Sequence, residues 1–360
     1  MKIICLLRAL CVGGVERQMT GLSVFLKKAG HDVSIMKYHP QNFYEEFLRE
    51  NGIPVVYIPK DKGTIDLCRR MADYFRENKV DVVISFSIGA NMKACIARMM
   101  YKDFKLVVSE RNYNNNFYPT EYIRFIAYNK ADRIVSNSHA QNNFIKNKFP
   151  SKAPKCQTIV NFVDLAKFHP AETAPENKAT HIVTTARVTK RKNVHGYILA
   201  ARALVEKGYK FTVDWYGYTK KDKYYYKCME LIEKNGLQDV FHIHAAAKNV
   251  TEIYHSADLF CLPSFYEGTS NSICEAIASG LPVACSDVSD SGIYVQPGRN
   301  GWLFDPEKPQ TIIDALSAAL DAGQEKLREY GRTSRLIAEE KLSIEKFTQE
   351  YIELINDLTK

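Results

Sequence analysis

The sequence lacks any long apolar run, and this absence argues against a membrane-spanning protein. No stretch of the 360 residues approaches the roughly 18 apolar residues that a transmembrane helix needs. The apolar run at the N-terminus is short and is interrupted by Arg8, which predicts a buried strand instead of a signal peptide. We therefore expect a cytoplasmic protein, and leave open a peripheral position at the inner face of the membrane.

Three familiar motifs are also missing. The nine cysteines are scattered without a C-x-x-C spacing, which predicts buried reduced thiols instead of a disulfide or zinc framework. No G-x-G-x-x-G fingerprint occurs, which argues against a dinucleotide oxidoreductase. No D-x-D motif is placed to hold a metal ion, so we expect neither a metal nor another cofactor.

Positive charge is concentrated in the first part of the chain. Residues 1–165 carry 25 Lys and Arg against 15 Asp and Glu, a net charge of +10, whereas the remainder carries −2. Such a surplus suits an anionic partner, which could be a nucleic acid, a phosphorylated substrate or an anionic membrane surface. A plain solvated surface would explain the charge equally well. Because nothing besides charge favours nucleic acid, we expect none.

Short β-rich runs alternate with amphipathic helical patterns along the whole chain. This rhythm predicts an α/β protein with doubly wound parallel sheets that helices cover on both faces. Residues 169–180 are rich in Pro, Ala and polar residues and read as a linker, after which the rhythm restarts in a second half. A long amphipathic helix at 344–358 could belong to either half. The expected strands are 2–7, 32–36, 80–85, 106–109, 134–138, 158–160, 181–187, 211–217, 241–243, 259–263, 282–285 and 301–304.

Ligands of open parallel sheets bind outside the carboxyl ends of the strands, so the loops at those ends are the candidate sites. Gly13 and Gly14 lie between the first strand and its helix. Two glycines allow close backbone approach and positive φ, and the helix that follows offers free amides to an anion. A tight turn without a ligand is the alternative.

A basic loop follows the first strand of the second half. Arg187 ends that strand, and Lys192 lies five residues later in the stretch ARVTKRKNVHG. A planar guanidinium and a compact ammonium would converge on a diphosphate. The alternative is a solvated basic loop, which would not explain why an arginine ends an apolar strand.

A third loop, SFYEGTSNSICEAIASGLPVACSD, holds two glutamates eight positions apart, Glu267 and Glu275. Ser272 and Glu275 fit a capping box, in which the glutamate serves only its own helix terminus. That alternative accounts neither for Glu267 nor for five small residues that leave the helix amides unshielded, as an anion site requires. These five are Gly268, Thr269, Ser270, Asn271 and Ser272.

A fourth region begins with Glu110 and Arg111 at the end of a strand and continues with six aromatic residues up to Tyr128. Most of these aromatics are expected to pack in the core. A docking face for a membrane or for a lipid-linked substrate is the other interpretation.

Together these stretches resemble the retaining family 4 glycosyltransferases of the GT-B fold, along nearly the whole chain. The E-x7-E pattern of Glu267 and Glu275 is the strongest element, followed by the R-x4-K pair of Arg187 and Lys192. IVNFVDLAKFHP is similar to the inter-domain signature of the family, GRNGWLFDP to a turn after a strand, and the two glycines near the N-terminus to its glycine loop. The resemblance implies an acceptor-binding domain over residues 1–165, with the helix at about 344–360 packing back on it, and a donor-binding domain over 166–343.

The resemblance also implies roles for the donor-site residues. Arg187 and Lys192 would bind the donor diphosphate and stabilise charge on the leaving nucleotide, while Glu275 would bind the ribose. Glu267 would contact the hydroxyls of the donor sugar, and the amides of residues 268–272 would hold the sugar and the distal phosphate. Gly13 and Gly14 would face the diphosphate from the other domain.

One departure from the family concerns the first half. Many members carry a histidine after the strand at 80–85, where this chain has Ser85, Phe86 and Ser87. Glu110 and Arg111, at the end of the adjacent strand, could substitute in binding the acceptor.

The implied reaction is transfer of a sugar, with retention, from a nucleotide-diphosphate sugar to a hydroxyl of a saccharide or lipid-linked acceptor. UDP is the default nucleotide, and bacterial surface polysaccharide, such as capsule or lipopolysaccharide, is the expected context. The cations of the basic loop would replace a metal. A nucleotide-sugar epimerase on the same fold and a non-catalytic nucleotide-sugar-binding protein are the alternatives.

Overall fold

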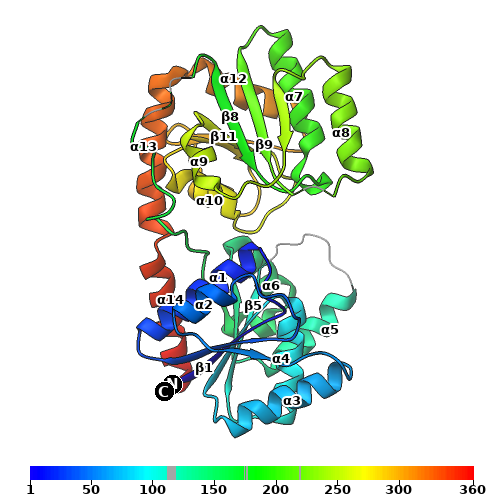
Figure 1. The fold of residues 1–360 in the computed structure, drawn as a ribbon, viewed down its shortest axis with the longest axis vertical. Helices are drawn as coiled ribbons and strands as arrows, with labels where there is room; N and C mark the ends of the chain where they lie inside the picture. The colour runs from blue at the N-terminus through cyan, green and yellow to red at the C-terminus, as the bar shows by residue number, and fades with distance from the viewer. Residues whose placement is uncertain (112–118, 174, 176, 219) are drawn as a thin grey trace. The chain divides into compact units, whose positions relative to one another are not determined.

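The computed structural model describes residues 1–111, 119–173, 175, 177–218 and 220–360, and they form two α/β units (Figure 1). Unit 1 comprises Met1–Phe162 with Glu345–Lys360, and unit 2 comprises Val163–Ile344. The described residues of the expected linker, 169–180, belong to unit 2, where Asn177 donates a hydrogen bond of 2.9 Å to the Asp258 carboxylate. The chain passes between the units before that stretch, so the linker prediction was wrong.

Unit 1 is built on a seven-stranded parallel sheet with the order β3-β2-β1-β4-β5-β6-β7. Helices α3, α4 and α5 pack on one face, while α1 and α14 contribute to the other. The strands are β1 (Lys2–Leu7), β2 (Asp32–Lys37), β3 (Val55–Tyr57), β4 (Val82–Phe86), β5 (Lys105–Glu110), β6 (Arg133–Ser136) and β7 (Cys156–Thr158). The helices are α1 (Gly14–Lys28), α2 (Glu45–Glu50), α3 (Thr64–Glu77), α4 (Ile88–Met100), α5 (Pro119–Ala127), η1 (Tyr128–Lys130), α6 (His139–Lys148), η2 (Pro150–Lys155) and α14 (Ile344–Thr359).

Unit 2 is built on a six-stranded parallel sheet with the order β10-β9-β8-β11-β12-β13. Helices α7, α8 and α12 cover one face and α9, α10 and α13 the other (Figure 1). The strands are β8 (Thr180–Thr185), β9 (Phe211–Tyr216), β10 (Phe241–His244), β11 (Leu259–Leu262), β12 (Val283–Ser286) and β13 (Gly301–Phe304). The helices are η3 (Lys190–Lys192), α7 (Val194–Glu206), α8 (Lys223–Lys234), α9 (Val250–His255), α10 (Asn271–Ala278), α11 (Ser291–Tyr294), α12 (Pro309–Asp321) and α13 (Gly323–Lys341).

The apolar runs explain why these segments form strands. Every residue of β4 (VVISF) and of β11 (LFCL) is buried, as a parallel sheet with helices on both faces demands. Two doubly wound parallel sheets confirm the predicted fold class. The short edge strand β3 was missed, because its three residues carry too little pattern and Tyr57 is exposed.

The cysteines behave as predicted. All nine are free, seven of them are buried, and burial raises the pKa of the Cys5 and Cys95 thiols to about 12. The seven buried thiols pack in the cores of the two units.

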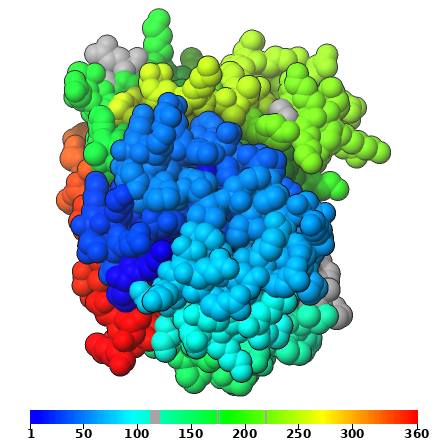
Figure 2. Space-filling view, turned by 60° about the horizontal axis from the view of Figure 1, so that its bottom comes forward, coloured from blue at the N-terminus to red at the C-terminus, as the bar shows by residue number. Residues whose placement is uncertain are grey.

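The last helix, α14, belongs to unit 1. Phe347 packs against Phe162 with ring centroids 5.0 Å apart, and Tyr351 lies 6.4 Å from Phe86 at the end of β4. The two termini lie next to each other in Figure 1, and Figure 2 shows the red atoms of α14 beside the blue N-terminal residues. No described helix has the length and apolar character needed to cross a membrane.

Each sheet order reverses once. In unit 1 the reversal lies between β1 and β4, and in unit 2 between β8 and β11. At such a switch point the loops that follow the two central strands diverge and leave a crevice, which is where ligands bind in this class of fold.

Candidate functional site

The two loops at the switch point of unit 2 carry the predicted donor-binding residues. Arg187 and Lys192 follow β8, and Glu267 follows β11. The Lys192 ammonium and the Glu267 carboxylate form an ion pair of 2.5 Å, with each side chain only 9% exposed. The structure therefore brings the R-x4-K loop and the first glutamate of the E-x7-E pattern together.

The charges of this pair are set by burial and by their neighbours. Burial lowers the pKa of Lys192, and Glu267 opposes that effect only in part, while the charges of Arg191 and Arg187 lower it further. Burial raises the pKa of Glu267, but Lys192 outweighs it, so the pKa of this carboxyl lies below its ordinary value. Glu267 is therefore an ionised carboxylate within a cationic loop.

The basic loop owes its shape to Asn193. This residue adopts the left-handed region, with φ 53° and ψ 40°, which asparagine tolerates better than most residues. Its side-chain oxygen accepts a hydrogen bond of 3.1 Å from the Gly196 amide and so caps α7. This turn ends η3 at Lys192, leaves Arg187 exposed, and places Arg191 over the Tyr266 ring at 5.5 Å.

The loop between Glu267 and Glu275 ends at helix α10, which begins at Asn271. Ser270 is the N-cap residue, without a side-chain cap, and Ser272 instead donates a hydrogen bond of 2.6 Å to the Thr185 carbonyl at the end of β8. The capping-box alternative was therefore wrong, because Ser272 ties α10 to the neighbouring strand.

Glu275 lies on the buried side of α10, in contact with α9. The Tyr254 hydroxyl donates a hydrogen bond of 3.1 Å to its Oε2 atom and lies 2.7 Å from the Thr185 hydroxyl. Glu267 and Glu275 thus have different partners: the first pairs with a cation, the second with a phenol. Thr269 and Ser270 are buried between them, and Gly268, Asn271 and Ser272 are half-buried.

The glycine loop of unit 1 lies at the other switch point. Gly13 is extended (φ −174°) and caps α1, which begins at Gly14. Neither glycine has the positive φ that the sequence allowed. What they contribute is their small size, because the lack of a side chain leaves the first amides of α1 uncovered. Contact of this loop with the diphosphate stays a prediction.

Sequence reasoning missed one feature of that switch point, the backbone of Ser87. This residue follows β4, where family members carry the histidine, and it has φ 83° and ψ 148°. A serine rarely adopts this conformation, and the cost of about 1–3 kcal/mol marks a strained residue. The signal available in the sequence was the missing histidine, although it said nothing about strain.

Glu110 and Arg111 are both buried, and their partners differ. Tyr128 donates a hydrogen bond to Glu110, and the Arg124 guanidinium lies 3.5 Å from its Oε2 atom. Asn91 extends this network by donating to the Tyr128 hydroxyl at 2.9 Å. Burial raises the pKa of Glu110, which is fully enclosed by these groups. This geometry gives Glu110 a packing role, and its contact with an acceptor stays a prediction.

Arg111 lies over the Phe86 ring at 3.8 Å and donates a hydrogen bond of 3.2 Å to Asn161. Within the described ranges its Nε and Nη2 atoms have no hydrogen-bond partner, and burial lowers its pKa. It is therefore better placed than Glu110 to receive an anionic or hydroxyl-rich group. Tyr113, Phe117 and Tyr118, which the sequence analysis counted among the aromatics here, lie outside the described residues.

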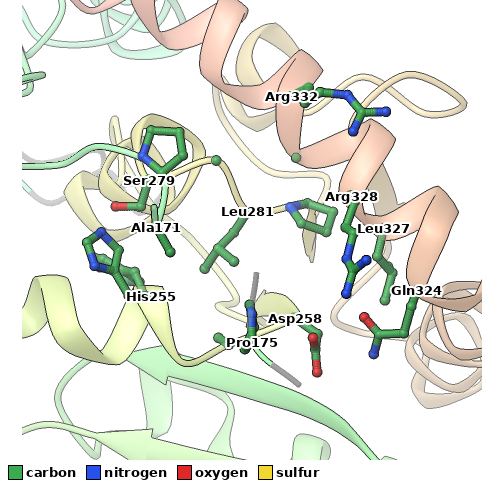
Figure 3. A pocket seen from close by; sticks show the side chains of 16 residues that line it. Ala171, Pro175, His255, Asp258, Ser279, Leu281, Gln324, Leu327, Arg328 and Arg332 are labelled. Carbon is green, nitrogen blue, oxygen red and sulfur yellow. The ribbon is translucent and has the colours of Figure 1, made fainter. Parts of the chain in front are cut away.

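A cavity of about 280 Å³ in unit 2 is lined by none of the site residues that the sequence predicted, although Tyr254 contributes to its wall. It lies between α13 and the segments before β11 and β12, with Arg328 and Gln324 on one side and Asp258 on the other (Figure 3). This is the amino edge of the sheet, opposite the edge where ligands of such folds bind. We do not assign it to the site.

Two doubly wound sheets, with a cationic loop and a paired glutamate at the second switch point, define a GT-B glycosyltransferase. The model described as "Glycosyl transferases group 1" matches residues 166–335, and that described as "Glycosyltransferase Family 4" matches residues 12–167. The two models together span most of the chain, which therefore belongs to the group 1 glycosyltransferases.

Known proteins are similar over long stretches. The GtfA subunit of a UDP-N-acetylglucosamine–peptide N-acetylglucosaminyltransferase of Streptococcus pneumoniae is 24% identical over 78% of this chain, which spans 59% of that relative. A second relative is a 4-alpha-N-acetylgalactosaminyltransferase of Campylobacter jejuni, which is named for a diphospho-undecaprenol acceptor. It is 24% identical to this chain, and the match covers 73% of this chain and 70% of the relative. The crystal structure of Anabaena HepE with UDP superposes with a TM-score of 0.86 at 18% identity, over 99% of this chain and 100% of that one.

Proposed function

We propose that this protein transfers a sugar, with retention, from a UDP-sugar to a hydroxyl of a saccharide or lipid-linked acceptor in surface polysaccharide synthesis. The observation that carries the proposal is the buried pair of Lys192 and Glu267, which joins the two loops of the unit 2 switch point. The pair sets a cation and a carboxylate side by side, and this combination suits a sugar diphosphate.

The two groups suit opposite ends of the donor bond that breaks. Cleavage leaves negative charge on the diphosphate, which Lys192 and Arg187 stabilise, while positive charge develops on the sugar. An ammonium has three N–H donors, so the bond to Glu267 leaves two for phosphate oxygens. The other oxygen of Glu267 accepts from sugar hydroxyls, and a phosphate oxygen of the leaving group takes the acceptor proton.

Similar proteins support the donor and acceptor classes. HepE was solved with UDP and with UDP-glucose, and the Campylobacter jejuni relative is named for a lipid-linked acceptor. A metal-independent reaction follows from the cationic loop, and transfer should survive treatment with EDTA.

Replacing Glu267 by Ala tests the assignment. The variant should lose transfer while it still binds the nucleoside diphosphate, because the proposed ligand of Glu267 is the sugar. The measurement is release of nucleoside diphosphate with formation of a glycosylated acceptor, and proton NMR of the product gives its anomeric configuration. Full activity in the variant, or an inverted product, would overturn the proposal.

The same assay separates the alternatives. An epimerase would change the free nucleotide sugar without an acceptor, and a non-catalytic binding protein would bind it without turnover. The E-x7-E and R-x4-K loops alone do not distinguish these outcomes.

We also propose that unit 1 docks on an anionic membrane through α5. Tyr122, Ile123 and Ile126 are each more than half exposed on this helix, whereas Phe125 on its other side is buried. Apolar residues on one side of a helix, in the half of the chain with a net charge of +10, suit a lipid surface. Such a position would bring the enzyme to a lipid-linked acceptor.

Pelleting with phosphatidylglycerol vesicles tests this docking. Replacing Ile123 and Ile126 together by Ser should weaken binding on the order of tenfold, because two isoleucines leave the lipid. Ile65→Ser is the matched control, since Ile65 is 64% exposed on α3 of the same unit. Absence of binding even at low salt, or an equal loss in the control, would overturn the docking.

A further inference from the structure

Four side chains from three neighbouring strands meet on one face of the unit 2 sheet. His181 lies on β8, Asp214 on β9, and His242 and His244 on β10. In the parallel register His242 is the partner of Asp214, and His244 lies two residues further along the same face. The proposed transfer uses none of these four residues.

The distances among three of them suit a metal ion. The Asp214 Oδ1 atom lies 3.2 Å from His242 Nδ1 and 2.5 Å from His244 Nε2. The three potential ligand atoms all lie within 4.8 Å of one another. In a tetrahedral zinc site with bonds of about 2.0–2.1 Å, ligand atoms are about 3.3 Å apart, so small side-chain rotations would accommodate an ion.

The fourth residue, His181, fixes the carboxylate from behind. Its Nε2 atom lies 2.7 Å from Asp214 Oδ2, and its Nδ1 atom lies 2.9 Å from the Ser256 carbonyl. Both ring nitrogens thus face acceptors, which holds the imidazole in place. Asp214 is left with Oδ1 turned toward the two β10 histidines, which is the way outer partners orient metal ligands.

The two histidines of β10 are partly exposed to solvent as well as close to Asp214. The side chains of His242 and His244 are 38% and 40% exposed, so an ion can enter and keep a water molecule as its fourth ligand. The Tyr216 ring stacks on His244 at 4.5 Å and limits its rotation. Without a metal, Asp214 would serve only as a common acceptor for three imidazoles.

We propose that Asp214, His242 and His244 bind one divalent ion of the zinc class, which ties the edge strand β10 to β9. Imidazole nitrogens and one carboxylate, with an open fourth position, are a donor set that zinc accepts. The site lies at β9 and β10, whereas the donor loops follow β8 and β11. The proposed metal site is therefore distinct from the donor site, where we expect transfer to need no metal. Failure of one proposal would leave the other unaffected.

Zinc titration of the metal-free full chain against a chromophoric chelator tests the site. Wild type should bind one ion per chain, and Asp214→Asn and His244→Gln should each weaken that binding at least tenfold. His181→Phe, which removes the outer hydrogen bond, should weaken it about 10- to 100-fold. The control is His255→Gln: His255 and His169 form a pair with centroids 5.0 Å apart, and the contacts of their ring nitrogens are to carbonyl groups.

Cobalt substitution gives a second measurement, the visible absorption spectrum, which reports the ligands of the ion and not its affinity. Co²⁺ in the site should show visible bands without the thiolate band that cysteine ligation produces, and His244→Gln should abolish them. His244 is a surface residue, so circular dichroism should show that this variant keeps its fold. Unchanged zinc binding in Asp214→Asn and His244→Gln, an equal loss in His255→Gln, or a thiolate band would overturn the proposal.

Discussion

At the scale of single residues, the candidate site depends on one buried ion pair. Glu267 pairs with a loop that carries four cations, Arg187, Lys190, Arg191 and Lys192, and it is ionised because Lys192 lies 2.5 Å from it. Removal of one partner of a buried pair leaves the other uncompensated, which costs about 3–5 kcal/mol. The pair therefore joins the loops after β8 and β11 whether or not it also binds the donor.

Glu267→Gln should lower the free energy of unfolding of unit 2 at neutral pH by about 3–5 kcal/mol. The pKa of Glu267 is lowered in the folded state, so its contribution is present above the ordinary value of 4.5 and is lost as the pH falls through the folded value. The difference between wild type and variant, measured by urea unfolding, should shrink below pH 4.5. A difference that stays constant with pH would contradict the assignment.

The sequence alone could predict part of the pairing between Lys192 and Glu267. Arg187, Lys192 and Glu267 stand in a spacing that the family shares, and the sheet order brings their loops together. Burial could not be predicted from the sequence: Glu110 contacts Tyr128 and Arg124, which follow it in η1 and α5 and reach it only once the chain has folded. Its contact with an acceptor stays a prediction. The proposed metal site was missed because its residues come together only through the register in which β9 and β10 pair, and the sequence does not show that register.

At the scale of elements, the apolar runs predicted most of the strands, but the ends of many strands shifted by one or two residues. β13 matches the expected residues, since GWLF is bounded by turn residues on one side and Asp-Pro on the other. The capping box of Ser272 and Glu275 was wrong, because a tertiary hydrogen bond from Ser272 to the Thr185 carbonyl replaces the local cap. Local sequence patterns predict which helices and strands form, whereas contacts with neighbouring strands determine the residues at which they begin and end.

Ser87 makes the end of β4 the strained element of unit 1. Ser87→Gly should raise the free energy of unfolding by about 1 kcal/mol, because glycine adopts φ 83° without a steric penalty. If the strain serves the site, transfer should fall at the same time. The measurements are thermal unfolding and initial rates of product release.

Ser138→Gly is the matched control. Ser138 also caps a helix after a strand, but its φ is −145° and its side chain accepts a hydrogen bond from Gln141. This variant should lose a few tenths of a kcal/mol. Equal effects of the two substitutions would show that strain at Ser87 is not the cause.

At the scale of the whole molecule, the chain returns to its first unit through α14. Phe347 and Tyr351 are buried against Phe162 and Phe86, so the last sixteen residues complete a core that the first 162 begin. Unit 1 is thus made of two distant parts of the sequence. The sequence analysis predicted this return from the family resemblance, since the helical pattern alone fitted either half.

Phe347→Ala should destabilise unit 1 by about 3–5 kcal/mol, because it leaves a large cavity in a buried aromatic cluster. Calorimetry with and without UDP assigns the transitions, since UDP should raise the transition of unit 2 more than that of unit 1. Phe168→Ala, at a buried phenylalanine of unit 2, is the control and should lower the other transition. A shift of the unit 2 transition in Phe347→Ala would contradict this division.

The most direct test of the proposed site is calorimetric titration of nucleoside diphosphates into the full chain. UDP, GDP, ADP and dTDP should be compared on wild type, on Lys192→Ala and on Lys308→Ala, in which an exposed lysine of the same unit is removed. We predict that UDP binds wild type and Lys308→Ala alike and binds Lys192→Ala at least tenfold more weakly. No binding by any of the four, or equal binding by Lys192→Ala, would contradict a donor site at the unit 2 switch point.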